Sequence, residues 1–378
     1  MLEQTDAARS MRNEASAGPQ LSIVVPTFNE RANIVGLVDS LDVALAGIAW
    51  EVVFVDDDSP DGTAAEVRNL AQRDARVRGV QRVGRRGLST ACIEGILSTS
   101  APIVAVMDGD RQHDETALTK MLRKLDDHSI DLVIGSRYTE GGGIGDWDAK
   151  RARMSRFATM LADRLTGVHL SDPMSGFFMI RREAFMASLP NLSGIGFKIL
   201  LDIAASAPEP LHVDHVPFEF RSRVHGESKL DSVVLWEYLL LLLDKAIGHI
   251  VPVRFISFAL VGGSGVVVSL AILTLLFKGV GLNFADSQIA ATVVAISTNF
   301  VLNNSLTYRD RRLKGIRLFW GWISFNLVSA VGAIGNVGIA SYMFDLYYWN
   351  WIVSALAGIM VGVVWNYAAS SFVTWRRR

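Results

Sequence analysis

Four long stretches without charge constrain the fold of this chain more than any other feature. One lies between Arg254 and Lys278, and the others run from Ser287 to Tyr308, from Leu318 to Phe344 and from Leu346 to Trp375. Each is long enough to cross, as a helix, a hydrocarbon core of roughly 30 Å, which needs about 20 residues. Charged residues are dense up to about Lys245 and sparse beyond it. The chain is therefore predicted to have two parts built for different solvents, and the second part to span a membrane four times.

The loops between these stretches predict their orientation, because Lys and Arg are retained on the cytoplasmic side. Five basic residues separate the second and third stretches: Arg309, Arg311, Arg312, Lys314 and Arg317. Three more end the chain, whereas the opposite loops carry only Lys278. We therefore expect an integral protein of the cytoplasmic (plasma) membrane with both termini and the first part of the chain in the cytoplasm. An outer aromatic belt is expected at Tyr347, Tyr348, Trp349 and Trp351.

The segments outside the spans agree with this orientation. Residues 1–20 are expected to form a flexible tail, because they are charged and small residues without the apolar core of a secretory signal. The single cysteine, Cys92, excludes an intrachain disulfide, fits a reducing compartment and is interpreted as a buried side chain on a helix. Residues 231–252 contain an apolar run, Leu239–Leu243, that is too short to cross a membrane and lies among charges. An amphipathic helix in the membrane interface is expected there, ahead of a four-span domain at 253–378.

Several asparagines interrupt the uncharged stretches. Asn299, Asn303, Asn326, Asn336 and Asn366 are costly in hydrocarbon and are expected to face other helices. Hydrogen bonds between helices, with small residues such as Gly265 allowing close packing, are the first interpretation. A path for a lipid head group is the alternative.

Residues 21–230 show β-rich runs that alternate with helical patterns. The predicted strands are Leu21–Pro26, Glu51–Asp56, Ala101–Asp108 and Asp131–Arg137, and helices are expected from about Glu30, Gly62 and Glu115. Such alternation is typical of parallel βαβ units, whose ligands bind beyond the carboxyl ends of the strands. A dinucleotide-binding fold would need glycines directly after the first strand, but Pro26–Glu30 contains none. Phosphates must therefore be held in another way.

Carboxylates follow two of the predicted strands. Asp56, Asp57 and Asp58 end one, and Asp108-Gly109-Asp110 end another. Clustered carboxylates repel one another unless a cation joins them, and oxygen ligands with a phosphate partner suit Mg²⁺ or Mn²⁺. A divalent ion on both phosphates of a sugar nucleotide would neutralise the leaving group. The sequence thus predicts a site for a divalent metal ion, and a net charge of −1 gives no sign of nucleic-acid binding.

Seven motifs follow one another in register along the first part of the chain. They are VVPTFNE (24–30), VDDDSPDGT (55–63), MDGDRQH (107–113), GSRYTEGG (135–142), DPMSGFF (172–178), GFKILLD (196–202) and RVHGESKL (223–230). Together they resemble glycosyltransferase family 2, specifically its polyprenol-phosphate or dolichol-phosphate mannose synthases. The resemblance implies an α/β catalytic domain of the GT-A type, Rossmann-like with a mostly parallel sheet, over residues 21–230. Residues 253–378 resemble the GtrA-like membrane family.

The resemblance also implies roles for single residues. Donor contacts would come from Pro26, Phe28, Glu30, Val55, Asp57, Asp108, Gly109, Asp110, Gln112, Lys198, Arg223 and Lys229. Metal ligands would be Asp108, Asp110 and Gln112; acceptor-phosphate ligands would be Arg137 and Arg151; and catalytic residues would be Asp110, Arg137 and Arg223. The chain departs from the usual pattern at Gly109, Arg111 and Asp202, where Ala, an apolar residue and Glu are common. His113 is interpreted either as a metal neighbour or as a structural histidine.

The function implied is inverting transfer of mannose from GDP-mannose to a polyprenyl or dolichyl phosphate, giving a β-linked lipid. A glucosyltransferase using UDP-glucose and a lipid-linked sugar flippase with a nucleotide-binding head are the alternatives. A processive polysaccharide synthase fits less well, because no Q-x-x-R-W segment follows the catalytic core. The oligomeric state is not determined by these patterns.

Overall fold

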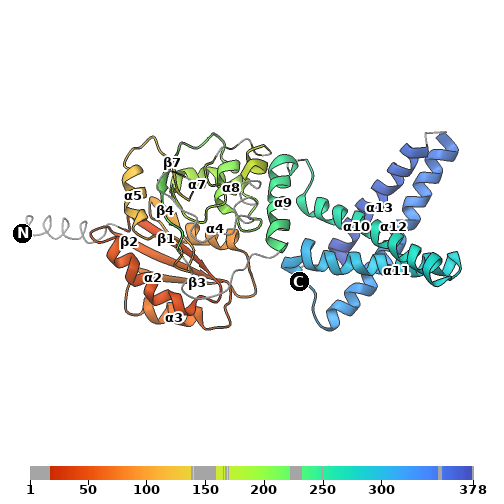
Figure 1. The fold of residues 1–378 in the computed structure, drawn as a ribbon, viewed down its shortest axis with the longest axis horizontal. Coiled ribbons are helices and arrows are strands. Elements are labelled where there is room, and N and C mark those ends of the chain that lie inside the picture. Colours follow the sequence, from red (N-terminus) through yellow and green to blue (C-terminus); the bar gives the residue numbers. More distant parts are fainter. Residues whose placement is uncertain are drawn as a thin grey trace, which may run out of the picture. The chain divides into compact units, whose positions relative to one another are not determined.

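The chain divides into two compact units, Met1–Ile247 and Gly248–Arg378 (Figure 1). The computed structural model describes residues 18–137, 139, 159–164, 166, 168, 170–221, 232–248, 250–347 and 351–376. Each unit is treated by itself below.

A seven-stranded sheet forms the centre of the first unit as far as it is described. Its strands are β1 (Leu21–Thr27), β2 (Trp50–Asp56), β3 (Val77–Gln81), β4 (Ile103–Val106), β5 (Leu132–Ser136), β6 (Phe178–Arg181) and β7 (Val213–Pro217). They lie in the order β3-β2-β1-β4-β6-β5-β7, and β6 alone runs antiparallel to its neighbours. The predicted mostly parallel α/β fold is confirmed. Strands β3, β6 and β7 had no counterpart among the predicted elements.

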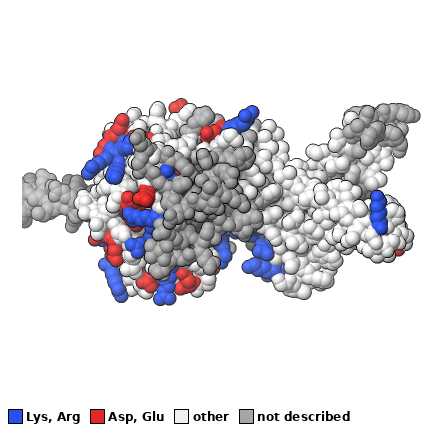
Figure 2. Space-filling model, in the orientation of Figure 1, with Lys and Arg blue, Asp and Glu red and all other residues white. Residues whose placement is uncertain are grey.

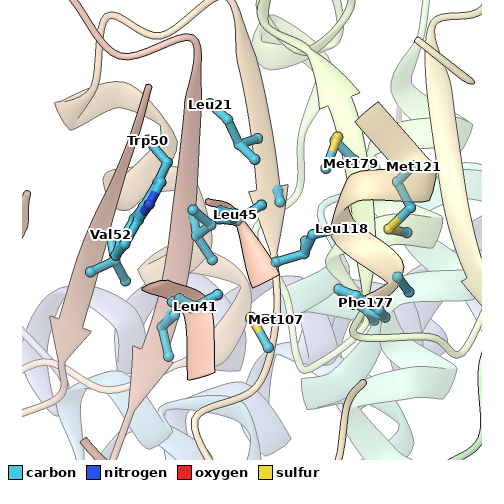
Figure 3. Packing of buried hydrophobic residues seen from close by; sticks show 14 of the residues in the cluster. Leu21, Leu41, Leu45, Trp50, Val52, Met107, Leu118, Met121, Phe177 and Met179 are labelled. Atoms are coloured by element: carbon cyan, nitrogen blue, oxygen red, sulfur yellow. The ribbon is translucent and has the colours of Figure 1, made fainter. Parts of the chain in front are cut away.

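Helices cover both faces of this sheet, so that a hydrophobic core lies on each face. The apolar side chains of β1 alternate between these two cores. Leu21, Ile23 and Val25 face α2 (Arg31–Ala44), α3 (Thr63–Ala71) and α5 (Ala117–Lys124). Figure 3 shows part of this core, with Leu21, Leu41 and Leu45 beside Trp50 and Val52. Val24 faces the other core, with α4 (Leu88–Ser98), α7 (Arg182–Ser188) and α8 (Ile199–Ser206). Cys92 on α4 is fully buried there, as predicted.

Helix α9 (Ser232–Ile247) ends the first unit, and its apolar side chains point to more than one side of the helix. Leu241 and Leu242 are buried against Leu201 of α8, in a small cluster that also includes Tyr238 and Ala162. Leu235 and Leu239 are 52% and 36% exposed. Part of the apolar run that the sequence assigned to the membrane interface is therefore used to attach the helix to α8.

Among the described residues of the second unit, four helices are long and apolar enough to cross a membrane, which agrees with the predicted number. They are α10 (Val253–Thr274), continued by a π-helical turn at Leu275–Val280; α11 (Phe284–Leu302), continued at Asn303–Thr307; α12 (Ile316–Tyr347); and α13 (Trp351–Val373). In Figure 2 the face of this unit that is in view is largely uncharged, whereas charges are spread over the first unit. The boundary between the last two spans differs from expectation, since α12 continues past Asp345. A single carboxylate near a helix end does not stop the backbone hydrogen-bond pattern.

Three of the asparagines inside the spans, Asn299, Asn336 and Asn366, pack against glycines of neighbouring helices, whereas Asn326 Nδ2 donates to the carbonyl of Trp322 in its own helix at 2.8 Å. Asn299 of α11 lies against Gly265 of α10, and Asn366 of α13 lies against Gly332 of α12. A Cβ atom at either glycine would collide with the amide group. These contacts support the interpretation that small residues let the helix backbones approach around polar side chains. The side chains of Tyr347, Tyr348, Trp349 and Trp351, the predicted aromatic belt, lie outside the described residues.

Candidate active site

The loops after β1 and β2 meet at the carboxyl edge of the sheet. The two strands pair in register up to Thr27 and Asp56. Beyond them the backbone N–H of Asn29 donates to Ser59 Oγ at 2.9 Å, and the N–H of Arg31 donates to Asp61 Oδ2 at 3.1 Å. Asn29 adopts a positive φ of 59°, which is uncommon for a residue other than glycine. The two loops are thus tied into one surface at the place where ligands of such sheets bind.

Three residues expected to contact the donor, Pro26, Phe28 and Glu30, belong to this surface. Pro26 lies opposite Val55 in the strand pair, but the side chain of Val55, also expected to contact the donor, is fully buried in the core beside α4. The guanidinium of Arg86 stands 4.1 Å from the ring centroid of Phe28. Glu30 accepts a hydrogen bond of 2.8 Å from Asn33 Nδ2. A hollow of about 430 Å³ opens beside this loop, lined by residues 29–33 with Asp61 and Glu66.

The three aspartates at the end of β2 have different hydrogen-bond partners. Asp56 accepts from both the N–H and the hydroxyl of Ser59, at 2.9 and 2.5 Å, and so forms the turn. Asp57 is held by Arg82 Nη1 at 2.9 Å and by the N–H of Gly87 at 2.7 Å. Asp58 accepts from Gln81 Nε2 at 3.0 Å. Protein groups therefore donate to all three carboxylates.

Arg82 is a residue that sequence reasoning missed. Its side chain is only 2% exposed, and it also donates to Thr90 Oγ1 and the carbonyl of Gly87. A buried arginine bonded to Asp57 holds a predicted donor-contacting carboxylate in place. The signal in the sequence is weak, because Arg82 stands after a short strand, β3, that was itself not predicted.

The Asp108-Gly109-Asp110 turn after β4 is supported from beneath by His113. The N–H of Asp108 donates to His113 Nδ1 at 3.2 Å, and Nε2 of the same ring lies 3.8 Å from Asp108 Oδ2. The imidazole is buried and stacks on Phe177 with 4.9 Å between ring centroids. Burial lowers the pKa of His113 to about 4, although the charge of Asp110 opposes this shift. His113 is therefore a neutral, structural histidine that positions the turn.

The DPMSGFF motif packs onto the same turn. A Cβ at Gly176 would lie 3.1 Å from Asp108 Oδ2, so only glycine leaves this space beside the carboxylate. Ser175 donates its hydroxyl to the carbonyl of Gly135 at 2.8 Å, and Phe177 supplies the ring under His113. The motif therefore shapes the site through its backbone and its small residue.

The oxygen atoms of Asp108, Asp110 and Gln112 are the candidate ligands for a divalent cation. Within the described residues, no group of three or more His, Cys, Asp or Glu side chains could hold a metal ion by itself. Two carboxylates, one amide oxygen and the space left by Gly176 fit an ion that shares its coordination with a diphosphate. The backbone N–H of Gln112 donates to Asp110 Oδ1 at 3.2 Å, and the side-chain Nε2 of Gln112 donates to the carbonyl of Arg221. These two bonds fix Gln112 relative to the carboxylate of Asp110.

Arg137, predicted to bind the acceptor phosphate, follows β5. Its Nε and Nη2 donate to the two carboxylate oxygens of Asp172 at 2.7 and 2.8 Å. Asp172 is fully buried, and it was not singled out by sequence reasoning although it begins the DPMSGFF motif. The bidentate pair fixes the plane of the guanidinium. The guanidinium carbon of Arg137 lies 5.6 Å from the ring centroid of Phe220, and that ring lies 5.9 Å from the ring of His113.

Lys198 stands at the start of α8 and donates to the carbonyl of Met174 at 3.1 Å, which joins GFKILLD to DPMSGFF. Arg151, Arg223 and Lys229 lie outside the described residues. The unusual Arg111 adopts a positive φ of 60° and its guanidinium lies against Gly36 of α2, donating to Ser40 Oγ at 3.3 Å. The glycine at position 36 makes room for it.

Comparison with known proteins identifies the two units separately. Residues 22–189 match the model of glycosyl transferase family 2, and residues 257–375 match that of the GtrA/DPMS transmembrane domain. A dolichol-phosphate mannosyltransferase of Pyrococcus furiosus is 34% identical over 94% of this chain and 99% of its own length. The chain belongs to the dolichol-phosphate mannosyltransferase group of glycosyltransferase family 2.

Two further similar proteins come from other organisms. The dolichol-phosphate mannosyltransferase of Saccharomyces cerevisiae is 37% identical, over 58% of this chain and 84% of its own. Glucosyl-3-phosphoglycerate synthase from Mycobacterium tuberculosis, in complex with Mn²⁺, uridine diphosphate and phosphoglyceric acid, is 22% identical. It covers 62% of this chain and 80% of its own, with a TM-score of 0.44, too distant a likeness to carry over ligands. As a member with four membrane-crossing helices, the present glycosyltransferase is an integral membrane protein.

Proposed function

We propose that the protein transfers mannose from GDP-mannose to a polyprenyl or dolichyl phosphate. The observation that carries this proposal is the similarity to the Pyrococcus furiosus dolichol-phosphate mannosyltransferase, which extends along 99% of that protein and so includes both units. The local geometry supports it, because His113 contacts both the Asp108–Asp110 turn and Phe220, and the guanidinium carbon of Arg137 lies 5.6 Å from the ring centroid of Phe220. A carboxylate pair suits a donor diphosphate with its cation, and a guanidinium suits an acceptor phosphate.

The reaction requires few groups from the protein. A phosphate monoester is largely a dianion at neutral pH, so its oxygen attacks the anomeric carbon without a general base. The bond from that carbon to the diphosphate oxygen breaks, GDP leaves with the electron pair, and the configuration inverts to β. No proton is transferred in this step. The main obstacle is repulsion between the incoming phosphate and the donor diphosphate.

Fixed cations of the chain would offset this repulsion. Arg137 presents a planar guanidinium whose orientation Asp172 sets, and Arg151 is proposed as the second acceptor ligand. Lys198, Arg223 and Lys229 are proposed to face the donor. Asp108, Asp110 and Gln112 would hold Mg²⁺ or Mn²⁺, which when bound supplies neutralisation of the diphosphate charge. The transfer is proposed to take place on the cytoplasmic face, where the basic loops of the second unit are expected.

An assay of donors tests the proposal. The purified full-length protein is incubated with a short-chain prenyl phosphate and labelled GDP-mannose, GDP-glucose or UDP-glucose, with and without Mn²⁺. We expect a mannosylated lipid from GDP-mannose, with β configuration by NMR. Faster transfer from UDP-glucose would replace the donor while keeping the family. Absence of transfer from every donor, together with movement of a lipid-linked sugar across vesicles, would favour the flippase instead.

A further inference from the structure

One sequence pattern occurs twice in the membrane unit. The segment ISFALV at 256–261 recurs as ISFNLV at 323–328, 67 positions later. At the same spacing, TNFVLNNSLTYR at 298–309 recurs as WNYAASSFVTWR at 365–376, which keeps one asparagine, one threonine, the final arginine and two aromatic positions. Such a fixed spacing is typical of an internal repeat. We call α10 with α11 the first hairpin, α12 with α13 the second, and residues 67 positions apart equivalent.

Contacts inside the first hairpin recur inside the second. The hydroxyl oxygens of Ser257 and Thr307 lie 2.8 Å apart. Those of the equivalent residues, Ser324 and Thr374, lie 2.9 Å apart. Each hairpin also packs one asparagine of its second helix against one glycine of its first: Asn299 against Gly265 and Asn366 against Gly332. The repeat in the sequence is therefore also a repeat of structure.

Equivalent residues of the two hairpins meet one another. Tyr308 stacks on its own equivalent, Trp375, with 4.1 Å between ring centroids and 4° between the ring planes. Phe258 likewise lies beside its equivalent, Phe325, with 6.4 Å between centroids. In a symmetric dimer, a residue contacts its own copy where it lies close to the two-fold axis. The two pairs therefore indicate where an axis relating the hairpins would pass.

Ring contacts beside this axis are reciprocal. The ring centroids of Phe258 and Tyr367 lie 5.7 Å apart. Exchanging each residue for its equivalent gives Phe325 and Phe300, whose ring centroids also lie 5.7 Å apart. A two-fold interface has this property, because a contact of one residue with another requires the same contact with the two partners exchanged.

Polar contacts across the interface follow the same rule. The hydroxyl oxygen of Tyr308 lies 2.7 Å from Ser371 Oγ. In the exchanged contact, Trp375 Nε1 donates to Asn304 Oδ1 at 3.2 Å. Asn304 is the equivalent of Ser371, so both stacked rings direct their polar atom to the same place on the opposite hairpin.

The two hairpins differ where the segment that connects them packs. Leu313 of this segment donates its N–H to Asn304 Oδ1 at 2.8 Å and accepts from Asn304 Nδ2 at 3.2 Å. A Cβ atom at Gly321 would collide with the side chain of Leu313. The equivalent positions of the other hairpin hold Ser371 and Arg254. The asparagine and the glycine thus stand on the side where the connecting segment passes, which gives these departures from the repeat a physical cause.

We propose that the membrane unit is an internal dimer, in which an aromatic face of the first hairpin binds the same face of its second copy. This face consists of Phe258, Phe300 and Tyr308 in the first hairpin and of Phe325, Tyr367 and Trp375 in the second. Parallel repeats in membrane proteins are related by an axis along the membrane normal, which agrees with two hairpins that begin and end at the same side. The partner that fits the face is a second copy of the hairpin. The proposal does not depend on the transfer reaction.

Making the two faces identical tests the proposal. In the full-length protein, Tyr367→Phe, Ser371→Asn and Trp375→Tyr together give the second hairpin the residues of the first. Each new side chain then occupies surroundings that already hold it at the equivalent position. Hydrogen exchange of α10–α13, followed by mass spectrometry during heating in detergent, measures the unfolding temperature of the membrane unit. We expect it to stay within about 3 °C of that of the parent.

A conservative exchange between positions that are not equivalent is the control. Phe258→Tyr with Tyr308→Phe moves one hydroxyl from its place beside Ser371 into the ring cluster. It keeps the composition of the face and nearly all of its volume. We expect the unfolding temperature to fall by about 5 °C or more, because a hydrogen bond is lost and a hydroxyl is buried among rings.

The proposal is overturned if the three-residue variant unfolds as early as the control, or if the control unfolds with the parent, since the face would then not distinguish equivalent positions from others. Exchange of the strands β1 to β5 in the same samples verifies that the first unit is intact. Because no activity enters the measurement, either result leaves the proposed transferase function untouched.

Discussion

Lys245 of α9 and Asp202 of α8 form an ion pair with 2.6 Å between Nζ and Oδ1, and both side chains are buried. Asp202 also accepts from the N–H of Ser193 at 3.1 Å and from that of Gly194 at 2.8 Å. Lys245 donates in addition to Ser206 Oγ and to the carbonyl of Asn191. The aspartate that replaces the more common glutamate thus joins three segments: α8, the loop before it and the helix that ends the first unit.

Breaking this pair is expected to destabilise the first unit strongly. Lys245→Ala leaves the carboxylate of Asp202 buried without its cation, which typically costs about 3–5 kcal/mol. Lys124→Ala is the matched control, because Lys124 also pairs with an aspartate at 2.6 Å but both side chains are nearly 40% exposed. That exposed pair should be worth less than about 1 kcal/mol. Urea unfolding of the full-length protein in detergent measures both, and equal losses would contradict the role of burial.

The stability of the first unit should depend on pH through His113. Its pKa is about 4 in the folded protein and 6.5 when unfolded, so the unfolded chain takes up the proton first as the pH falls. The contribution is complete above pH 6.5 and is lost between pH 6.5 and 4, by roughly 3 kcal/mol. His113→Asn keeps an acceptor for the N–H of Asp108 but cannot titrate there. Its unfolding free energy should vary less steeply over this pH range; parallel curves for variant and parent would show that the histidine does not cause the dependence.

Asp110→Asn tests the proposed cation site. The variant removes one ligand charge where a diphosphate has to be neutralised, so turnover should fall about 100-fold or more. The thermal unfolding temperature should change little, since the amide can still accept from the N–H of Gln112. Transfer is measured with labelled donor, with excess chelator as a second condition. Full turnover of the parent in chelator would remove the metal from the proposal.

Gly176→Ala tests the space beside Asp108. The added Cβ would lie 3.1 Å from Asp108 Oδ2, and the carboxylate must turn away to avoid it. We expect kcat to fall about tenfold and more Mn²⁺ to be needed for half-maximal activity. Gly262→Ala is the control, because nothing lies within 4 Å of a Cβ at that position. An unchanged Mn²⁺ requirement in Gly176→Ala would mean that this space does not serve a cation.

Arg82→Gln tests whether Arg82 acts on the donor through Asp57. Loss of the guanidinium removes the 2.9 Å contact and frees the carboxylate to rotate, so the KM for the donor should rise about tenfold. The acceptor KM should stay the same. Arg85→Gln, which removes a 59% exposed arginine of the same loop, should change neither value. If Arg82→Gln raises both KM values alike, the residue supports the fold in general and not the donor site.

Much of this protein could be predicted from local patterns. The membrane spans were predicted from long uncharged runs alone, and the helices of the second unit agree with them. A single segment in hydrocarbon has to be helical, because a helix satisfies its backbone hydrogen bonds internally. The strands β1, β2, β4 and β5 are apolar runs buried on both faces, which the sequence displays directly. The carboxylate turns were visible for the same reason: they stand where those runs end.

The remaining features depend on contacts between distant segments, for which a local pattern holds no signal. Arg82 reaches Asp57, Asp172 reaches Arg137 across 35 positions, and Lys245 reaches Asp202 from another helix. Each is a charged side chain that would be read as a solvated surface group, and it becomes buried only because the fold supplies an opposite charge. The sequence by itself therefore determined the family, the strands and the spans, whereas only the tertiary structure decided which charges are paired, because pairing of buried charges is set by how helices and loops pack.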